Sequence, residues 1–400
     1  MRQSVLCFAI VISWSAGLLA AEPARTTKPW DVERILAAGV KAEWGEPNGL
    51  VTPVRYQTED YQGRECRVFA YYGRPEGEGP FPAMLLVHGG GGKAFAEWAE
   101  LWAKRGYVAL AMDLAGNGPD GQRLKDGGPP QDDGGKLGAF DDGGLTDMWT
   151  YQAVAAVLRG HALLAARPQV DRKRIGATGI SWGGYLTCIV AGIDSQLKVA
   201  VPVYGCGYLH DNSAWQENGT FDSMAPEVRT RWLANFDPSA HLPGVSCPIL
   251  FVNGTNDFAY PLDSYQKSYR LVTAPRNLCV TVNMPHGHPQ GWAPSEIGAF
   301  VDSVLKEGKP LAKLSAPEVR GDSLSAAYDA EVPIAKAELH TTTDRGRWQD
   351  RKWASTTIQY DDQAKQVRGT LPPSRPLIAF VTVTDERGLT TSSEHVELSE

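Results

Sequence analysis

The fold is decided by one stretch of sequence, Arg174-Ile-Gly-Ala-Thr-Gly-Ile-Ser-Trp-Gly-Gly-Tyr-Leu-Thr-Cys-Ile-Val190. Its pattern predicts a buried strand, a sharp G-x-S-x-G turn and then a helix. The turn forces Ser181 into a strained backbone conformation, and the flanking glycines let strand and helix approach closely. The hydroxyl then points out of the turn at a helix N-terminus, which favours developing negative charge. We therefore predict that Ser181 is a catalytic nucleophile.

A glycine-rich loop lies well upstream of this turn. His88-Gly-Gly-Gly-Gly92 directly follows a buried apolar strand. Glycines expose backbone N–H groups to an oxyanion, so we expect the N–H of Trp182 and one from Gly90 or Gly91 to form an oxyanion hole. His88 is expected to brace the loop rather than act as a base. The loop lacks the G-x-G-x-x-G spacing and the GK[ST] ending of nucleotide-binding loops, so no cofactor is expected.

The acid and the base of a serine triad should follow Ser181 in the order Asp, then His. Asp257 comes after the buried strand 248–252 and a glycine turn, and Asp263 is a weaker candidate on the same loop. An aspartate here would hold the histidine tautomer and stabilise the imidazolium. His286 and His288 both follow the last strand, and we prefer His286 because it comes first and is followed by glycine. A metal site at these two histidines lacks companion ligands with metal spacing.

The rest of residues 22–309 predicts a mostly parallel sheet flanked by helices. An expected hairpin, 51–57 and 65–72, is followed by continuous apolar runs that alternate with helix-like segments. These runs are Ala83–Val87, Tyr107–Ala111, Val199–Val203, Pro248–Val252 and Leu278–Val282. The clearest amphipathic helices are predicted at 145–166 and 294–305.

Near Lys309-Pro310 the helical periods vanish. Short alternating segments follow, at 334–339, 356–360, 378–384 and 394–398. About seven short strands in about ninety residues predict a small all-β sandwich of immunoglobulin or fibronectin III type. The expected division is a signal peptide at 1–21, a catalytic domain at 22–309 and a sandwich at 310–400.

Two insertions interrupt the alternation of strands and helices. Residues 116–144 are crowded with Gly and Asp, too polar to bury, and are expected to form a long surface loop over one sheet edge. Residues 207–242 are richer in aromatics and follow a strand end, where they could roof a ligand site. The aromatic residues that we expect to bind substrate are Trp215, Tyr260 and Trp292.

Composition restricts the compartment and the partners. The net charge of -7 disfavours nucleic acid as a partner. Arg2, an apolar run at 5–19 and Ala20-Ala21 predict a cleaved secretory signal and a secreted or periplasmic protein without stable membrane insertion, with a retained anchor as the alternative. Five cysteines remain after the signal, so at least one cannot pair within the chain, and no disulfide framework is expected. Nothing in the sequence determines an oligomeric state.

Residues 51–308 resemble the dienelactone hydrolase, acetylxylan esterase and prolyl oligopeptidase branch of the α/β-hydrolases. The resemblance rests on His88–Gly92, Gly179–Gly184, Gly254–Pro261 and His286-Gly287. It implies the α/β-hydrolase fold with Ser181, Asp257 and His286 as the triad. Dienelactone hydrolases proper carry Cys where this chain has Ser181, so their own activity is not expected. The C-terminal region resembles the tail of PhoPQ-activated pathogenicity-related-like hydrolases, at 346–350 and 384–388.

The leading hypothesis is an exported serine esterase. It would cleave small-molecule or polysaccharide esters through an acyl-enzyme, most plausibly as an acetylxylan-esterase-like carbohydrate deacetylase. A prolyl oligopeptidase-type peptidase is the first alternative, although no β-propeller precedes the catalytic region. A non-catalytic protein that binds carbohydrate or a partner is the second, and the three filled triad positions argue against it.

Overall fold

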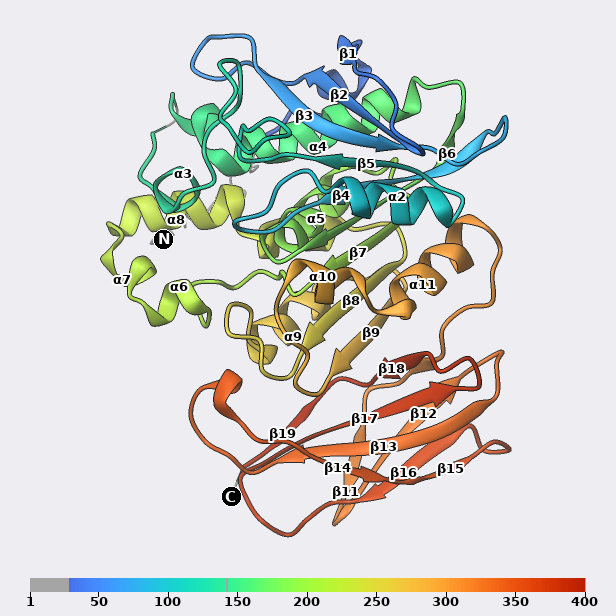
Figure 1. The fold of residues 1–400 in the computed structure, drawn as a ribbon. Helices are drawn as coiled ribbons and strands as arrows, with labels where there is room; N and C mark the ends of the chain where they lie inside the picture. Colours follow the sequence, from blue (N-terminus) through green and yellow to red (C-terminus); the bar gives the residue numbers. More distant parts are fainter. Residues whose placement is uncertain (1–28, 142, 400) are drawn as a thin grey trace, which may run out of the picture.

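The computed structural model describes residues 29–141 and 143–399, so the predicted signal peptide lies outside the described residues. A nine-stranded sheet organises the first part of the chain, in the order β1-β2-β3-β5-β4-β6-β7-β8-β9 (Figure 1). Strands β1 to β3 pair antiparallel, β3 joins β5 antiparallel, and all other neighbours are parallel. The predicted hairpin and the predicted parallel sheet are both confirmed. The strands are β1 Ala42–Trp44, β2 Val51–Gln57, β3 Arg67–Gly73, β4 Phe81–Val87, β5 Val108–Met112, β6 Val170–Ile180, β7 Val199–Val203, β8 Ile249–Gly254 and β9 Arg276–Thr281.

Helices cover both faces of this sheet, with α2 and α11 on one face and α4 and α5 on the other (Figure 1). Helix α1 packs on α4. This is the layered architecture that continuous apolar strands require. The helices are α1 Val32–Ala37, α2 Ala96–Lys104, α3 Asp133–Leu137, α4 Trp149–Ala165, α5 Trp182–Ile193, α6 Ala214–Glu217, α7 Thr220–Ser223, α8 Pro226–Phe236, α9 Leu262–Arg270, α10 His288–Trp292 and α11 Ser295–Leu305.

The prediction of an amphipathic helix at 145–166 is wrong in its character. A short 3-10 turn, Leu145–Asp147, precedes α4, and α4 is buried almost all round. Helices α1, α3 and α5 pack against it in addition to the sheet. A helix that is enclosed on all sides needs no polar face.

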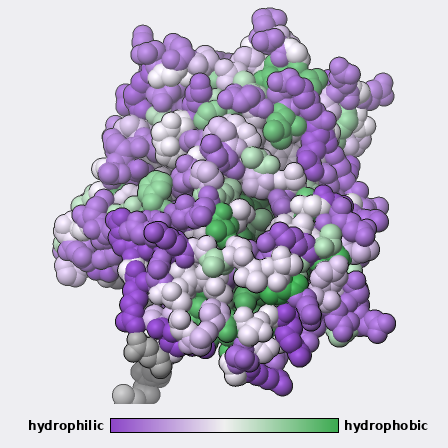
Figure 2. Space-filling model, turned by 60° about the horizontal axis from the view of Figure 1, so that its bottom comes forward, coloured by the Kyte–Doolittle hydropathy of each residue, from purple (hydrophilic) through white to green (hydrophobic). Residues whose placement is uncertain are grey.

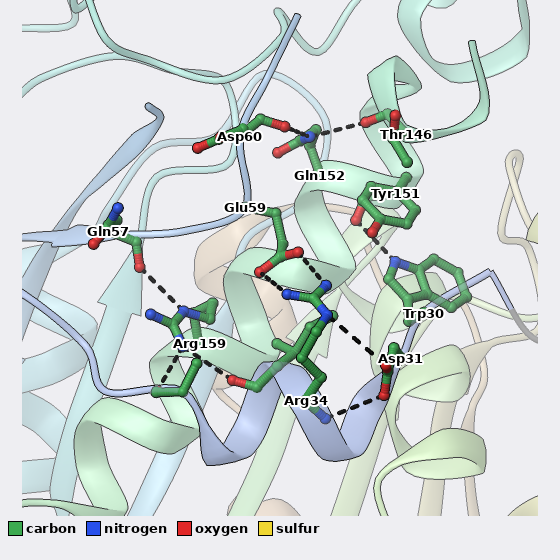
Figure 3. Close-up of polar contacts among 12 residues, drawn as sticks. Trp30, Asp31, Arg34, Gln57, Glu59, Asp60, Thr146, Tyr151, Gln152 and Arg159 are labelled. Atoms are coloured by element: carbon green, nitrogen blue, oxygen red, sulfur yellow. Dashed lines mark hydrogen bonds and ion pairs between the residues drawn. The ribbon is translucent and has the colours of Figure 1, made fainter. Parts of the chain in front are cut away.

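Arg159 is a charged side chain buried in α4, and it caps α1 (Figure 3). Its Nη1 donates to the carbonyl oxygens of Ile35 and Ala38 at 3.0 and 2.7 Å, and its Nη2 donates to Gly39 O at 2.8 Å. Its Nε also donates to Gln57 O at 3.4 Å. The guanidinium thus satisfies carbonyls that the end of a short helix leaves without partners.

Replacing Arg159 by methionine is expected to lower the free energy of unfolding by about 3 kcal/mol, since the carbonyls around it would stay buried without donors. Denaturant-induced unfolding followed by circular dichroism measures the change. The control is Arg172→Met, at an exposed position on β6. Equal losses in the two variants would contradict the capping role of Arg159.

Residues 313–398 form two five-stranded sheets, which confirms the predicted all-β region. One sheet holds β10, β12, β16 and β15 with β11, and the other holds β14, β13, β17 and β18 with β19. Their facing sides enclose a separate hydrophobic cluster. The strands are β10 Lys313–Leu314, β11 Glu318–Arg320, β12 Ser323–Asp329, β13 Ile334–Thr342, β14 Ala354–Thr357, β15 Gln359–Asp361, β16 Gln366–Thr370, β17 Leu377–Asp385, β18 Thr390–Ser392 and β19 Val396–Leu398.

Two details of this region differ from the prediction. The strand expected at 356–360 breaks at Ile358, so that β14 and β15 join different sheets. Strand β17 does not alternate between buried and exposed residues, because both of its faces are covered. We propose that the domain boundary lies at 311–312, two residues after the predicted one at 309–310, since Leu311 belongs to the hydrophobic core of the large sheet and Ala312 to that of the sandwich.

The expectation that residues 116–144 form a plain surface loop is wrong in part. Within them, α3 and its neighbourhood bury Leu137 and Phe140. The second insertion, which contains α6 to α8, packs on the first. Trp232 Nε1 donates to Lys136 O at 2.8 Å, and Arg231 Nη1 donates to Phe140 O at 2.8 Å. Two backbone carbonyls of the first insertion, those of Lys136 and Phe140, therefore find their donors in the second insertion.

The five cysteines of the described residues are buried and unpaired. Burial raises the pKa of each thiol, to about 12 in Cys66 and about 11 in Cys247. All five thus remain protonated at neutral pH and pack as small apolar groups.

The surface is polar on the face that Figure 2 brings forward, where small apolar patches lie among hydrophilic side chains. No helix of the described ranges combines the length and the apolar character that a membrane span requires. Among residues 29–141 and 143–399, four large hydrophobic side chains are exposed, namely Trp44, Leu101, Phe258 and Tyr360.

Candidate active site

Ser181 stands at the turn between β6 and α5, in a backbone conformation that L-residues rarely adopt. Its φ is 58° and its ψ is -119°. A Cβ on Gly183 would lie 1.9 Å from Val87 O, and one on Gly179 would lie 2.2 Å from Gly183 O. Strand and helix therefore cross too closely for any side chain at either glycine. The sequence and the packing together impose this strain on Ser181, as in a nucleophile elbow.

Asp257 and His286 are joined by a short hydrogen bond. Asp257 follows β8 and is 2% exposed. Its Oδ1 accepts the N–H groups of Ala259 and Tyr260 at 2.9 and 2.8 Å, which orients the carboxylate. Its Oδ2 accepts the Nδ1–H of His286 at 2.6 Å. With its proton on Nδ1, the imidazole presents Nε2 as a proton acceptor.

The end of β7 contacts both Ser181 and His286. The N–H of Ser181 donates to Val203 O at 2.9 Å. The next residue, Tyr204, stacks its ring on the His286 imidazole, with centroids 4.3 Å apart and planes at 24°. The Tyr204 hydroxyl donates to Pro285 O at 2.7 Å. Tyr204 thus holds the loop of His286 next to β7, the strand whose Val203 carbonyl accepts the Ser181 N–H.

His288 and Asp263 have other partners. His288 Nε2 accepts the N–H of Gly89 at 3.0 Å, and burial lowers the pKa of His288 to about 4, so it stays neutral and keeps accepting. Asp263 accepts the Asn212 amide at 3.0 and 2.9 Å. Within residues 29–141 and 143–399 no three His, Cys, Asp or Glu side chains are grouped to hold a metal ion.

His88 connects the glycine-rich loop to the end of β5. Its Nδ1–H donates to Gly89 O at 2.7 Å, and its Nε2 accepts the N–H of Leu114 at 2.8 Å. The side chain is buried, and burial lowers its pKa to about 4. A neutral imidazole with both nitrogens bonded to backbone is suited to bracing the loop.

The candidate oxyanion donors lie side by side. Trp182 is the first residue of α5, so its N–H has no acceptor within the helix. Gly90 and Gly91 are exposed, and Gly91 has a φ of 66°, which favours glycine. A Cβ on Gly90 would lie 3.2 Å from Trp182 Cδ1, so the loop touches the start of α5.

A row of aromatic rings runs from Trp182 to His286. Trp215 of α6 lies 4.6 Å from the Trp182 ring and 5.5 Å from the Tyr260 ring. The Tyr260 ring is 6.5 Å from the His286 imidazole and nearly parallel to it. The sequence analysis missed Phe258, which is 53% exposed with its ring 4.9 Å from His286. The sequence signal that could have identified Phe258 is its position directly after the candidate acid Asp257.

Trp292 has different neighbours from Trp215 and Tyr260. Its ring stacks on Trp98 of α2 at 5.3 Å, and its edge contact with Phe95 is also 5.3 Å. The structure thus places this predicted substrate-binding residue against α2.

The first insertion reaches the same row of rings. The Lys136 ammonium lies 4.8 Å from the centre of the Trp182 ring and 3.0 Å from Asp133. This lysine is buried, and the sequence analysis did not single it out. Together with the α8 contacts, the cation–π pair anchors both insertions above α5.

Known proteins share these features. Residues 51–223 match the family model of acetyl xylan esterase (AXE1), and residues 188–348 match that of the PhoPQ-activated pathogenicity-related protein. The acetyl esterase Axe7A of Xylanibacter ruminicola is 26% identical over 253 residues, which cover 58% of this chain and 54% of that esterase. The chain thus spans about half the length of this curated relative.

Two solved acetyl xylan esterases share the fold. The enzyme of a Paenibacillus species superposes with a TM-score of 0.56 at 21% identity, covering 68% of this chain and 92% of that one. The corresponding values for the enzyme of a Thermoanaerobacterium species are 0.55, 19%, 69% and 92%. The chain has the α/β-hydrolase fold. Within that class it resembles the acetyl xylan esterases, and its later part resembles the PhoPQ-related hydrolases, as the sequence motifs implied.

Proposed function

We propose that this α/β-hydrolase cleaves carboxylic esters with Ser181 as the nucleophile, His286 as the base and Asp257 as the residue that orients the base. The observation that carries the proposal is the 2.6 Å hydrogen bond between Asp257 and His286. The His286 imidazole stacks on Tyr204, which follows β7, the strand next to the strained Ser181. The elbow and the oriented imidazole are the two parts that nucleophilic acyl transfer requires.

The proposed reaction has two halves. Ser181 Oγ attacks the acyl carbon while His286 Nε2 takes the hydroxyl proton, and the oxyanion receives the N–H groups of Trp182 and of Gly90 or Gly91. His286 then gives the proton to the departing alcohol oxygen, which leaves an acyl-serine. Water attacks the acyl-serine with His286 again as the base, and the carboxylic acid departs as the serine recovers its proton.

The proposed substrate class is acetylated carbohydrate, encountered after export of the protein. Phe258 is exposed and Trp215 is half-buried, so these two rings offer flat apolar faces, onto which sugar rings stack. The match of residues 51–223 to the acetyl xylan esterase model supports the same class. Trp215 would line this site, and Phe258 would contact the carbohydrate at its edge. Tyr260, which the sequence analysis expected to bind substrate, is fully buried and would support the Trp215 ring instead.

A substrate panel tests the proposed function. Acetylated xylan and p-nitrophenyl acetate should be hydrolysed, and proline-containing peptides should not. Phe258→Ala should raise KM for acetylated xylan about two- to tenfold, the equivalent of a ring contact of about 0.5–1.5 kcal/mol, with p-nitrophenyl acetate affected less. Tyr360→Ala is the control, since it removes an exposed aromatic ring from the sandwich. Faster turnover of peptides than of any ester would overturn the proposal in favour of a peptidase.

A further inference from the structure

The C-terminal sandwich lies against β9, the edge strand of the large sheet (Figure 1). Strand β17 contributes side chains both to the core of the sandwich and to the interface with the large sheet. Alternate residues from Leu377 to Val383 face the core of the sandwich. Ile378 and Phe380, on its other face, join a second hydrophobic cluster with Leu262 of α9 and Val280 of β9. Both faces of β17 are thus buried, and one of them is buried by the catalytic part of the chain.

The residues that the large-sheet part of the chain contributes to this cluster lie close to Asp257 and His286 in the sequence. Leu262 begins the helix that follows the Asp257 loop. Val280 lies near the end of β9, the strand that leads to His286, and the partly buried Val282 directly follows that strand. The sandwich therefore packs beneath both segments that carry the Asp257–His286 pair.

Polar contacts tie the edge strand to the sandwich. The N–H of Val280 donates to Ser392 Oγ at 2.7 Å, and the same hydroxyl donates to Val280 O at 3.2 Å. Asn277 Nδ2 donates to Ala312 O at 2.8 Å. The contacts at Val280 give β9 partners on the side where the sheet has no further strand.

Trp348 fills the centre of this interface. It begins the 3-10 turn Trp348–Asp350 of the sandwich and is 4% exposed. It belongs to the cluster of Leu262 and Val280. The Arg351 guanidinium lies 3.9 Å from its ring centre, which closes the cluster toward solvent.

The residues on either side of Trp348 bind the second insertion. Arg347 Nη1 lies 3.3 Å from Glu217 Oε2, and Gln349 Nε2 donates to the same carboxylate at 3.1 and 3.2 Å. Glu217 ends α6, the helix that carries Trp215. The position of Trp215 beside Trp182 thus depends on a contact with the sandwich.

We propose that the sandwich is a supporting part of the active site, and that the 347–349 segment acts at two points. Trp348 is a positioning residue that holds the Asp257 and His286 loops in register. Arg347 and Gln349 hold α6 and thereby the substrate-binding face of Trp215. The inference rests on the proposed triad, and it assigns to the C-terminal domain a role in catalysis and substrate binding.

The first test compares Trp348→Ala, Trp348→Phe and Tyr328→Ala in the full chain. Tyr328 is buried in the sandwich core on the sheet that faces away from the large sheet, so its loss reports destabilisation alone. Trp348→Ala should lower kcat on p-nitrophenyl acetate about tenfold to a hundredfold at 25 °C with little change in KM, because small misplacements of catalytic groups are costly. Trp348→Phe should recover most of the activity. An equal loss of kcat in Tyr328→Ala at similar Tm would overturn the role of Trp348.

The second test replaces Arg347 and Gln349 together by alanine. KM for acetylated xylan should rise several-fold while kcat on p-nitrophenyl acetate stays within about twofold of the parent, because α6 carries a binding residue and no triad member. Arg320→Ala removes an exposed arginine of β11 and its pair with Glu318, and serves as the control. An unchanged KM in the double variant would overturn this half of the inference.

The rate at which a fluorophosphonate labels Ser181 separates this inference from the proposed function. Labelling needs the nucleophile and the oriented base but no particular ester. If the parent protein is labelled yet hydrolyses no ester of the panel, the proposed substrate class is wrong, while slower labelling of Trp348→Ala still supports the inference. Equal labelling rates in the parent and in Trp348→Ala would overturn the inference and leave the proposed function intact.

Discussion

Replacing Ser181 by alanine is expected to lower kcat on p-nitrophenyl acetate by about 10⁴-fold or more. The substitution removes the only atom that can form the acyl-enzyme, and it leaves the backbone of the elbow in place because the Cβ is retained. Binding should survive, since Trp215 and Phe258 are untouched. The affinity for acetylated xylan should therefore change far less than kcat.

Initial rates and fluorophosphonate labelling measure this effect. Mass spectrometry should find the label on the peptide that contains Ser181 in the parent and on none in the variant. Ser223→Ala, which alters an exposed serine of the second insertion, is the control. Hydrolysis at the parent rate without Ser181 would show that another group attacks the ester.

Replacing His286 by alanine is expected to lower kcat by about 10⁴-fold, whereas His288→Ala should lower it about tenfold. The two histidines differ in their partners. His286 is bonded to Asp257 at 2.6 Å and can move a proton, whereas His288 accepts from Gly89 and positions the oxyanion loop. Loss of that acceptor should loosen the donors without removing the base.

The comparison uses kcat, the labelling rate and Tm for each variant. His288→Gln offers an amide oxygen to Gly89 and should recover part of what His288→Ala loses. His286→Gln should recover nothing, because an amide does not accept the serine proton. A loss of kcat in His288→Ala as large as in His286→Ala would leave the assignment of the base without support.

The elbow illustrates what can be predicted from local sequence. The strained φ of Ser181 follows from the close crossing of β6 and α5, which the glycines at 179 and 183 permit. These steric constraints act within a few residues, so they can be predicted from the motif alone. The parallel strands were predictable for a similar reason, because a continuous apolar run suits a strand that is covered on both faces.

The misassignments arose where a segment's partners are remote in sequence. Helix α4 lacks a polar face because α1 and α3 cover it. Neither contact can be recognised from the hydrophobic periodicity of the α4 sequence. The same holds for β17, whose outer face is buried by α9 and β9. The exposure of Phe258 beside His286 likewise depends on how two separate loops meet.

By itself, the sequence determined the α/β-hydrolase fold, the all-β region and the candidates for a triad, because steric limits at turns and the burial of apolar runs operate over short stretches. Only the tertiary structure decided that Asp257 pairs with His286 rather than His288, and that Trp348 packs beneath both loops. Two histidines separated by one residue have the same local chemistry. Which of them meets the carboxylate depends on the packing of Tyr204 and Gly89, residues far away in the chain.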